Sequence, residues 1–409
     1  MSLPRLTPVR TAIGVVGVLV LAWIGWTLVQ ATRADLLAQS DPEAALRIDP
    51  DHPQALLQRA WKQMGRGDND AATATARRVL ALEPGQGDAF AVLALAAMRR
   101  GDANANALAR IALQRAPRNR DLRATEAAAL LKQGDLPAAM AQIDALLRLS
   151  PERGKTLFPA LVQQAQDKRF AEALGAVLAR DPPWRPAFLK VLNKEATSVA
   201  VDQIYAWLQQ HGELSTAETG RWLDRMLADG RWGEAYAHWV GTLGANAGRL
   251  TPVHDGGFEQ DPGGQGFGWR NAPVRGVFTD IEAGAGPNGS RAAHLHFIGR
   301  PAARGNLSQA LLLAPGRFRL SLRARSDFLR SDRGLQWIVR CEGGPVLGEL
   351  DVPDGNAAWR LLSVDFEVPA ERCPGQWLEL RNPAVRGTAQ NVSGDLWIDD
   401  VAITPLGAD

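Results

Sequence analysis

The first hydrophobic pattern in the chain is an uncharged apolar run over residues 11–29, preceded by Arg5 and Arg10 with no acidic residue before it. At about 1.5 Å per residue, a helix of this length is just long enough to cross a hydrocarbon core of about 30 Å. We predict an uncleaved transmembrane helix over residues 11–31, because the run exceeds the roughly 7 to 15 apolar residues of a secretory signal. The positive-inside rule then leaves residues 1–10 in the cytoplasm and exports the rest of the chain.

A cleaved secretory signal is the alternative interpretation of this run. Val29, Gln30 and Ala31 satisfy the small-residue pattern of a cleavage site. Either interpretation places the bulk of the chain outside the cytoplasm. After Lys194 all basic charge is carried by arginine, and alanine is abundant, which is typical of a GC-rich bacterial source. We therefore expect a single-pass protein of the bacterial inner membrane with its bulk in the periplasm.

From residue 35 to about residue 248, apolar positions recur with the period of amphipathic helices. The helical runs are interrupted every 33 or 34 residues by a Gly-Asp pair and by a proline. The pairs are Gly67-Asp68, Gly101-Asp102 and Gly134-Asp135, and the prolines are Pro84, Pro117 and Pro151. A period of about 34 residues indicates stacked helical hairpins, each of which needs its neighbours to bury its apolar face.

The hairpins resemble tetratricopeptide repeats. In the unit over residues 53–84, the residues at the usual positions of that repeat are Ala60, Gly67, Asp68, Ala72 and Pro84. The resemblance is strong over residues 53–151, and the flanking segments look like truncated or degenerate units. It implies an all-α repeat array over residues 35–248 that binds peptides or other proteins.

Tryptophans are concentrated in the last helical units. We interpret them as core or interdomain packing residues, and a pocket for a partner is the alternative. They are Trp184, Trp207, Trp222, Trp232 and Trp239.

Around Thr251 the hydrophobic period changes from 3.6 to 2, as in half-buried strands. The alternating segments are 292–298, 307–313, 317–325, 335–341, 360–368, 377–381 and 396–403. About eight short strands without helices between them predict a β-sandwich, and a jelly roll is a common arrangement of that number. The predicted fold is therefore multidomain, with a transmembrane helix, an all-α tetratricopeptide-like array and a C-terminal all-β jelly-roll sandwich over residues 251–409.

The same region carries a second resemblance, which rests on the order of several short motifs. They are Asp255-Gly256-Gly257-Phe258-Glu259, Trp269, Leu307-Ser308-Gln309, Pro315-Gly316-Arg317-Phe318, Trp359 and Leu396-Trp397-Ile398-Asp399-Asp400-Val401. In this order they resemble galactose-binding-type jelly-roll carbohydrate-binding modules over about residues 254–405. The resemblance implies a glycan-binding face on the sandwich.

The carbohydrate-binding resemblance also implies a structural calcium ion. Carried onto this sequence, its ligands are Glu259 and either Asp399 or Asp400. Calcium takes several hard oxygen ligands, and carboxylates from the first and last strands would join the two ends of the domain. Surface-exposed or hydrogen-bonded carboxylates are the alternative.

Two strand faces are candidates for glycan contact. Trp377 alternates with Glu379 and Arg381 against inward leucines, so we predict that its ring is the platform on which a sugar stacks. On the strand 317–325, arginines including Arg319 and Arg323 share one face that suits an anionic glycan. The alternative is a solvated face on which these arginines pair with acids of neighbouring strands.

Two further pairs of residues are candidates for covalent or metal chemistry. Cys341 and Cys373 both fall in the exported sandwich, where an oxidising periplasm favours a disulfide. His294 and His296 lie two apart on a strand and share a face, a geometry compatible with a metal, but no third ligand is visible in the sequence.

Charge and motifs exclude several functions. The net charge is only +2, without the basic surplus of a nucleic-acid-binding domain. The sequence has no GxSxG elbow, HExxH helix or phosphate-binding loop, so we expect no enzyme. The first hypothesis is a membrane-tethered scaffold whose repeats bind a protein and whose sandwich binds a glycan. By analogy, it would be an accessory factor of bacterial envelope or extracellular polysaccharide assembly or export.

Two alternative functions stay open. The first is an enzyme that processes envelope glycans, since abundant Asp and Glu do not exclude a pair of catalytic carboxylates. The second is a pure protein-interaction scaffold whose sandwich no longer binds sugar.

Overall fold

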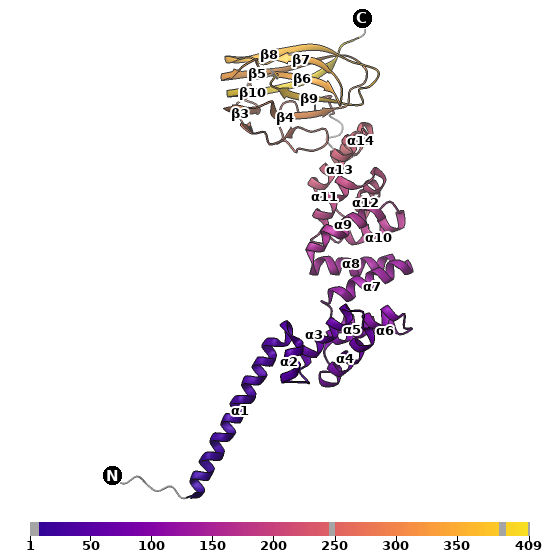
Figure 1. The fold of residues 1–409 in the computed structure, drawn as a ribbon. Helices are drawn as coiled ribbons and strands as arrows, with labels where there is room; N and C mark the ends of the chain where they lie inside the picture. Colours follow the sequence, from indigo (N-terminus) through magenta and orange to yellow (C-terminus); the bar gives the residue numbers. More distant parts are fainter. Residues whose placement is uncertain (1–7, 245–249, 384–389, 408–409) are drawn as a thin grey trace, which may run out of the picture. The chain divides into compact units, whose positions relative to one another are not determined.

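The computed structural model describes residues 8–244, 250–383 and 390–407 (Figure 1). The chain divides into two compact units, Met1–Phe188 and Leu189–Asp409. The first unit is helical. Its elements are α1 (Pro8–Ser40), α2 (Pro42–Ile48), α3 (Pro53–Gly65), α4 (Asn69–Leu82), α5 (Gly87–Arg100), α6 (Ala105–Arg115), α7 (Arg120–Gln133), α8 (Leu136–Leu149), the 3-10 turn η1 (Pro151–Arg153), α9 (Gly154–Gln164) and α10 (Lys168–Leu178). Helix α11 (Arg185–Glu195) begins in the first unit and ends in the second.

Helix α1 joins the apolar segment to the repeats. An 18-residue window within its stretch Val15–Ser40 has a mean hydropathy of 1.8, and α1 is the one helix among the described residues that is long and apolar enough to cross a membrane. A secretory signal near the N-terminus would have the same composition. The large apolar side chains of residues 15–29 are exposed, whereas Ala34 and Ala38 are buried. One continuous helix therefore carries the apolar segment and begins the helical core.

The repeated Gly-Asp pairs end one helix and begin the next. Gly101 and Gly134 have left-handed backbones, with φ of 74° and 77°, which glycine adopts without steric cost. The carboxylates of Asp68 and Asp135 accept hydrogen bonds from backbone N–H groups three residues on, at 3.1 and 3.2 Å, and so cap α4 and α8. Asp102 differs, because its carboxylate binds Arg100 instead. These local interactions account for the repeat seen in the sequence.

The described residues of the second unit form three complete helices and a two-sheet sandwich. The helices are α12 (Ser198–His211), α13 (Thr216–Ala228) and α14 (Trp232–Thr242). The strands are β1 (Arg270–Asn271), β2 (Val277–Glu282), β3 (Ala292–Pro301), β4 (Arg304–Leu311), β5 (Gly316–Ser331), β6 (Gln336–Cys341), β7 (Val346–Asp351), β8 (Gly355–Val368), β9 (Gln376–Arg381) and β10 (Asn391–Pro405).

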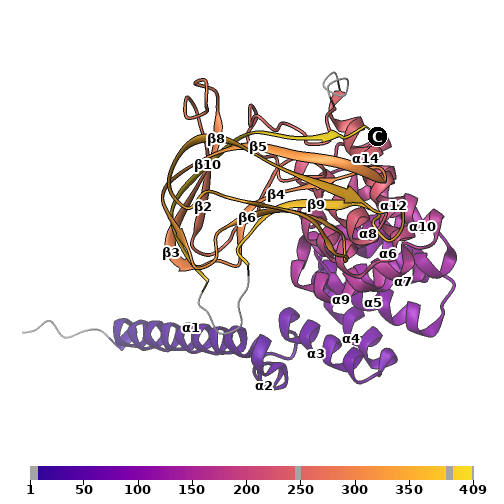
Figure 2. The same cartoon turned by 90° about the horizontal axis from the view of Figure 1, so that it is seen from above.

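The strands form two antiparallel sheets of five strands each among the described residues. The first sheet has the order β1-β4-β9-β6-β7 and the second has the order β2-β3-β10-β5-β8. Figure 2 shows β4, β6 and β9 in one layer and β5, β8 and β10 in the other. Alternate side chains of both sheets fill the core between them, including Leu320, Trp337, Leu378 and Leu396.

The structure confirms the predicted combination of a helical region and a C-terminal β-sandwich. The change from helices to strands falls between Thr242 and Arg270, close to the expected position. The compact units divide elsewhere, because α12, α13 and α14 belong with the sandwich. Strands β1, β2 and β7 were not among the predicted segments.

Candidate binding surfaces

The first motif of the sandwich closes onto β10 through backbone contacts. The carbonyl oxygen of Gly256 accepts a hydrogen bond from the Val401 N–H at 2.9 Å. A Cβ atom on Gly256 would lie 1.8 Å from the Val401 oxygen, so only glycine fits. Trp269 Nε1 donates to the Asp255 oxygen at 2.9 Å, and its ring stacks on Phe258. These motif residues therefore hold the fold together.

Two carboxylates converge beside this motif. Asp399 is 1% exposed, and the Ser290 hydroxyl donates to its Oδ2 at 2.8 Å. Asp399 Oδ1 and Glu259 Oε1 each lie 3.9 Å from the position that a Cβ on Gly257 would occupy. Burial, reinforced by the charges of Asp400 and Glu259, raises the pKa of Asp399 although the Ser290 hydrogen bond opposes it.

The donor set at these carboxylates fits a hard cation. Asp400 turns away from it, because its Oδ2 lies 3.2 Å from Arg323 Nε. Of the three carboxylates predicted as calcium ligands, Glu259 and Asp399 are the two that the structure brings together, and their role as ligands stays a prediction. No group of three or more His, Cys, Asp or Glu that could hold a metal occurs among the described residues. Calcium would need carbonyl, hydroxyl or water oxygens to complete its shell.

The predicted stacking residue Trp377 lies on the outer face of β9, as the alternating burial of that strand shows. Its ring meets Trp232 of α14 edge to face, with centroids 5.7 Å apart. The Arg270 guanidinium lies 4.9 Å from the Trp377 ring centroid, and Trp377 Nε1 donates to Glu342. Trp377 is thus half-buried by the protein's own side chains.

The other two residues predicted on β9 share that outer face. Glu379 Oε1 accepts a hydrogen bond from Arg340 Nε at 3.0 Å. Arg381 is half-buried and pairs in register with Arg304 of β4 and Gln336 of β6.

Helix α14 packs on this face through its tryptophans. A Cβ on Gly375 would lie 2.0 Å from the Trp232 ring, so the ring sits directly on the backbone. Trp232 and Trp239 also contact Phe267 of the glycine-rich loop, with centroids 6.0 and 5.6 Å apart. Trp232 and Trp239 are 2% and 5% exposed. Their interpretation as packing residues is confirmed.

A small cavity remains where α13, α14 and the first sheet meet. Its volume is about 190 Å³. An ion pair crosses it, with Arg270 Nη2 2.7 Å from Asp224 Oδ1. The cavity is lined by Asp224, Leu227, Ala228, Trp232, Arg270, Glu342 and Trp377. An aromatic edge among carboxylates and a guanidinium offers hydrogen-bonding groups and one apolar surface.

The arginine face of β5 is partnered along its length. Arg319 binds Asp365 in a bidentate pair, with contacts of 2.6 and 2.8 Å. Arg323 pairs with Asp400. The Arg325 guanidinium lies 3.9 Å from the Trp397 ring centroid. In the structure this face has acidic and aromatic neighbours, which is the alternative left open above.

The two histidines of β3 share one carboxylate from β10. Asp395 Oδ1 lies 2.7 Å from His294 Nε2 and 2.8 Å from His296 Nδ1. Burial acts to raise the pKa of Asp395, but hydrogen bonds and charge from the histidines outweigh it and lower that pKa. Sequence reasoning missed Asp395, because the pairing of β3 with β10 joins residues about a hundred positions apart.

The two cysteines of the sandwich are joined in a disulfide. It links the end of β6 to the segment before β9 and spans 32 residues. Cys341 is fully buried.

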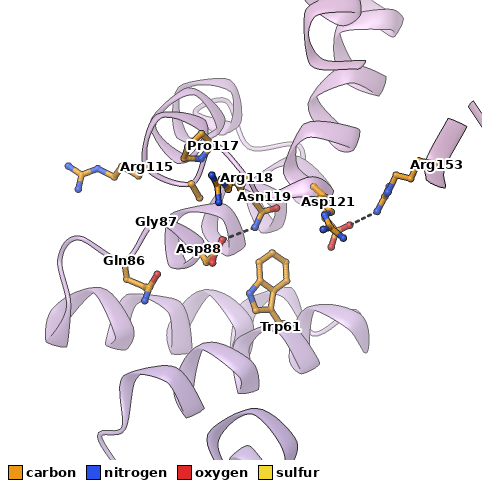
Figure 3. Close-up of a pocket in the computed structure, with 12 residues that line it drawn as sticks. Trp61, Gln86, Gly87, Asp88, Arg115, Pro117, Arg118, Asn119, Asp121 and Arg153 are labelled. Carbon is orange, nitrogen blue, oxygen red and sulfur yellow. Dashed lines mark hydrogen bonds and ion pairs between the residues drawn. The ribbon is translucent and has the colours of Figure 1, made fainter. Parts of the chain in front are cut away.

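A cavity in the first unit lies across successive hairpins (Figure 3). Its volume is about 630 Å³. Its lining comes from α3, the start of α5, the connection between α6 and α7, and η1. Trp61, Asp88, Arg118, Asn119 and Arg153 are among the side chains around it (Figure 3). Sequence reasoning named no residue here, because lining positions from separate repeats come together only through the stacking of hairpins.

No protein-family model matches the sequence, and no curated protein matches it. Solved structures do match. The CBM22-1 and GH10 modules of a xylanase from Clostridium thermocellum, complexed with xylohexaose, match with 18% identity and a TM-score of 0.28, over 38% of this chain and 28% of that chain. A CBM22-1 xylan-binding domain from Paenibacillus barcinonensis matches with 16% identity and a TM-score of 0.26, over 35% of this chain and 88% of that chain.

A Pseudomonas aeruginosa protein, pilF, matches with 17% identity and a TM-score of 0.23, over 48% of this chain and 95% of that chain. At these scores the matches carry no argument about function, and the fold stated above rests on the structure itself.

Proposed function

We propose that this chain is a membrane-anchored periplasmic scaffold that holds a protein partner on its helical repeats and a glycan on its β-sandwich, as an accessory factor of bacterial envelope or extracellular polysaccharide assembly. The proposal rests on the structure of helix α1. Its exposed apolar stretch and its buried residues Ala34 and Ala38 belong to one helix, so the anchor and the repeats are joined without a linker.

The apolar stretch serves as the anchor in the inner membrane through residues 11–29. The two arginines before it keep the start of the chain in the cytoplasm. Repeats and sandwich then work in the periplasm, a compartment that maintains disulfides such as Cys341–Cys373.

The glycan surface is the outer face of the first sheet around Trp377. Stacking needs an aromatic surface, and the residues that bond sugar hydroxyls around it are Glu379, Arg381 and the carboxylates of the neighbouring cavity. Because Trp232 covers part of the Trp377 ring, a single sugar unit fits the remaining space better than a long chain. The partnered arginines Arg319 and Arg323 play a smaller part.

Calcium would be held by Glu259 and Asp399. The contacts described for the buried Asp399 carboxylate include no positive charge, and the ion would supply one. It would also link the first motif to β10.

The test is binding of purified bacterial polysaccharides to the full chain in nanodiscs. We expect at least one polysaccharide to bind, and the affinity to fall about tenfold in Trp377→Ala. The matched control is Trp207→Ala, a half-buried tryptophan of α12 that stacks on His211 outside the cavity.

Two other outcomes assign the alternatives. No binding by any polysaccharide, with the chain folded and a protein partner retained, makes this a pure protein-interaction scaffold. Cleavage or transfer of the glycan over time, abolished by a carboxylate substitution in the cavity, makes it an enzyme.

A further inference from the structure

The cavity of the first unit lies in the most basic stretch of the chain. Residues 99–123 contain seven arginines and two aspartates, with no lysine or glutamate. The arginines of this stretch that line the cavity are Arg115, Arg118 and Arg120, and Arg153 of η1 also lines it. Figure 3 shows Arg118 at the cavity and Arg153 directed toward Asp121. Asp88 and Asp121 are the acidic residues of the lining, so the rim has a positive excess.

Several charged side chains around the cavity already interact with other residues of the protein. Arg153 Nη2 lies 3.4 Å from Asp121 Oδ1. Asp88 accepts a hydrogen bond from Asn119 Nδ2 at 3.0 Å. The Arg115 guanidinium lies 4.9 Å from the Phe90 ring centroid. Each of these groups is fixed in place by a neighbour.

Arg118 and Arg120 differ from these residues because they have no such partner among the described residues. Both side chains are exposed, and the structure gives neither of them a hydrogen bond, ion pair or ring contact with any described residue. The guanidinium groups of Arg118 and Arg120 therefore line the cavity without an ion-pair partner among the described residues, in a lining that includes the half-buried indole of Trp61. Arginine and tryptophan are the residue types most often found at the energetic centre of protein interfaces.

From this arrangement we infer that the cavity takes an acidic segment of a partner protein, with carboxylates at Arg118 and Arg120 and one large apolar side chain against Trp61. The inference rests on the proposed function, which gives the repeats a protein partner, and it adds the chemistry of that partner. Carboxylates pair with guanidinium groups in bidentate fashion, which fixes the direction of the segment as well as its charge.

A peptide segment fits this cavity better than other anions do. Asp88 accepts from Asn119 through Oδ1, so its carboxylate keeps acceptor capacity for an N–H group of a peptide backbone. A lipid surface is flat and would not enter a recess across three hairpins. A polysaccharide has no large apolar side chain for Trp61.

The probe for the test is a fluorescent decapeptide with four glutamates on each side of two leucines. Its affinity for the full chain in nanodiscs is measured by fluorescence polarisation at about 0.15 M salt, where long-range attraction is screened beyond about 8 Å. A peptide with glutamine in place of glutamate is the matched ligand. We expect the glutamate peptide to bind at least tenfold more tightly than the glutamine peptide.

The protein variant is Arg118→Glu/Arg120→Glu, and we expect it to lower the affinity for the glutamate peptide at least tenfold. Its control is Arg77→Glu/Arg169→Glu, which changes the net charge equally at two exposed arginines of α4 and α10 outside the cavity. We expect the control to change the affinity less than twofold. Equal losses in the two variants, or no preference for the glutamate peptide, would overturn the inference.

A competition arm separates the other anions. Alginate or phosphatidylglycerol vesicles that bind with the same dependence on Arg118 and Arg120, while the peptide does not bind, would also overturn the inference.

Photo-crosslinking in cells separates this inference from the proposed function. A partner captured with equal yield by the wild type and by the double reversal binds the repeats elsewhere, which rejects the cavity and keeps the scaffold. Capture of no partner by either protein rejects both.

Discussion

The arginines of the sandwich and those around the cavity of the helical unit look alike in sequence but differ in their surroundings. On β5, Arg319 and Arg323 each have an acid opposite them on a neighbouring strand. Around the helical cavity, Arg118 and Arg120 have none among the described residues. A run of arginines therefore indicates a binding surface only after its internal partners have been identified.

The tryptophans show the same contrast. Trp377, predicted to stack on sugar, lies against Trp232 and Arg270, whereas Trp61 has no ring contact with another described aromatic side chain. In the sandwich, the protein's own side chains cover much of the surface around Trp377 that the sequence predicted to bind a ligand. In the helical unit the surface stays open.

The largest effect should come from uncovering Trp377. Trp232→Ala removes a ring that is 2% exposed, and such truncations cost about 3 to 5 kcal/mol. We expect a lower free energy of unfolding of the second unit in urea, together with faster oxidation of Trp377 by N-bromosuccinimide. Unchanged reactivity of Trp377 would show that Trp232 does not shield it.

Loss of the disulfide should come next and should be confined to the sandwich. Closing a loop of 32 residues lowers the entropy of the unfolded chain by an amount worth about 3 to 4 kcal/mol. We expect Cys341→Ser/Cys373→Ser to lower the unfolding midpoint of the sandwich, followed by its tryptophan fluorescence. The helical unit, followed by circular dichroism at 222 nm, should keep its midpoint. A shift of both midpoints would show that the two units unfold together.

Calcium should stabilise the sandwich through Asp399. At a free concentration a hundred times the dissociation constant, a bound ion adds about 2.7 kcal/mol. We expect calcium to raise the melting temperature of the wild type but not of Asp399→Asn.

When a chelator removes calcium, we expect Asp399→Asn to become more stable than the wild type. The pKa of Asp399 is raised on folding, so its contribution to stability is greatest at low pH and is lost as the pH rises through the folded-state pKa. The asparagine variant escapes this loss and should be more stable than the wild type at neutral pH without calcium. Equal responses of the two proteins to calcium would reject the site.

A helix cap of the first unit should give a smaller effect. Asp135→Ala removes the acceptor for the first turn of α8, and such a loss costs about 1 kcal/mol. A urea titration followed by circular dichroism measures it. The control is Asp102→Ala, whose carboxylate caps no helix, and which should change the midpoint less.

The sequence predicted those parts of the fold that depend on local interactions. The Gly-Asp turns depend on one backbone conformation and one side-chain cap, so their period is visible in the chain. The alternation of Trp377, Glu379 and Arg381 likewise follows from strand geometry alone.

Contacts between distant segments were not predictable in this way. The pairing of His294 with Asp395 depends on the register of β3 with β10, and the covering of Trp377 depends on where α14 packs. The open cavity was missed for the same reason, since its lining is drawn from several hairpins.

The comparison between the two sets of arginines is tested most directly in one binding assay. The glutamate peptide is titrated against Arg118→Gln/Arg120→Gln and, in parallel, against Arg319→Gln/Arg323→Gln, each as the full chain in nanodiscs. We expect a loss of affinity of at least tenfold for the first pair and less than twofold for the second. A loss that is equal in both, or larger for the sandwich pair, would contradict it.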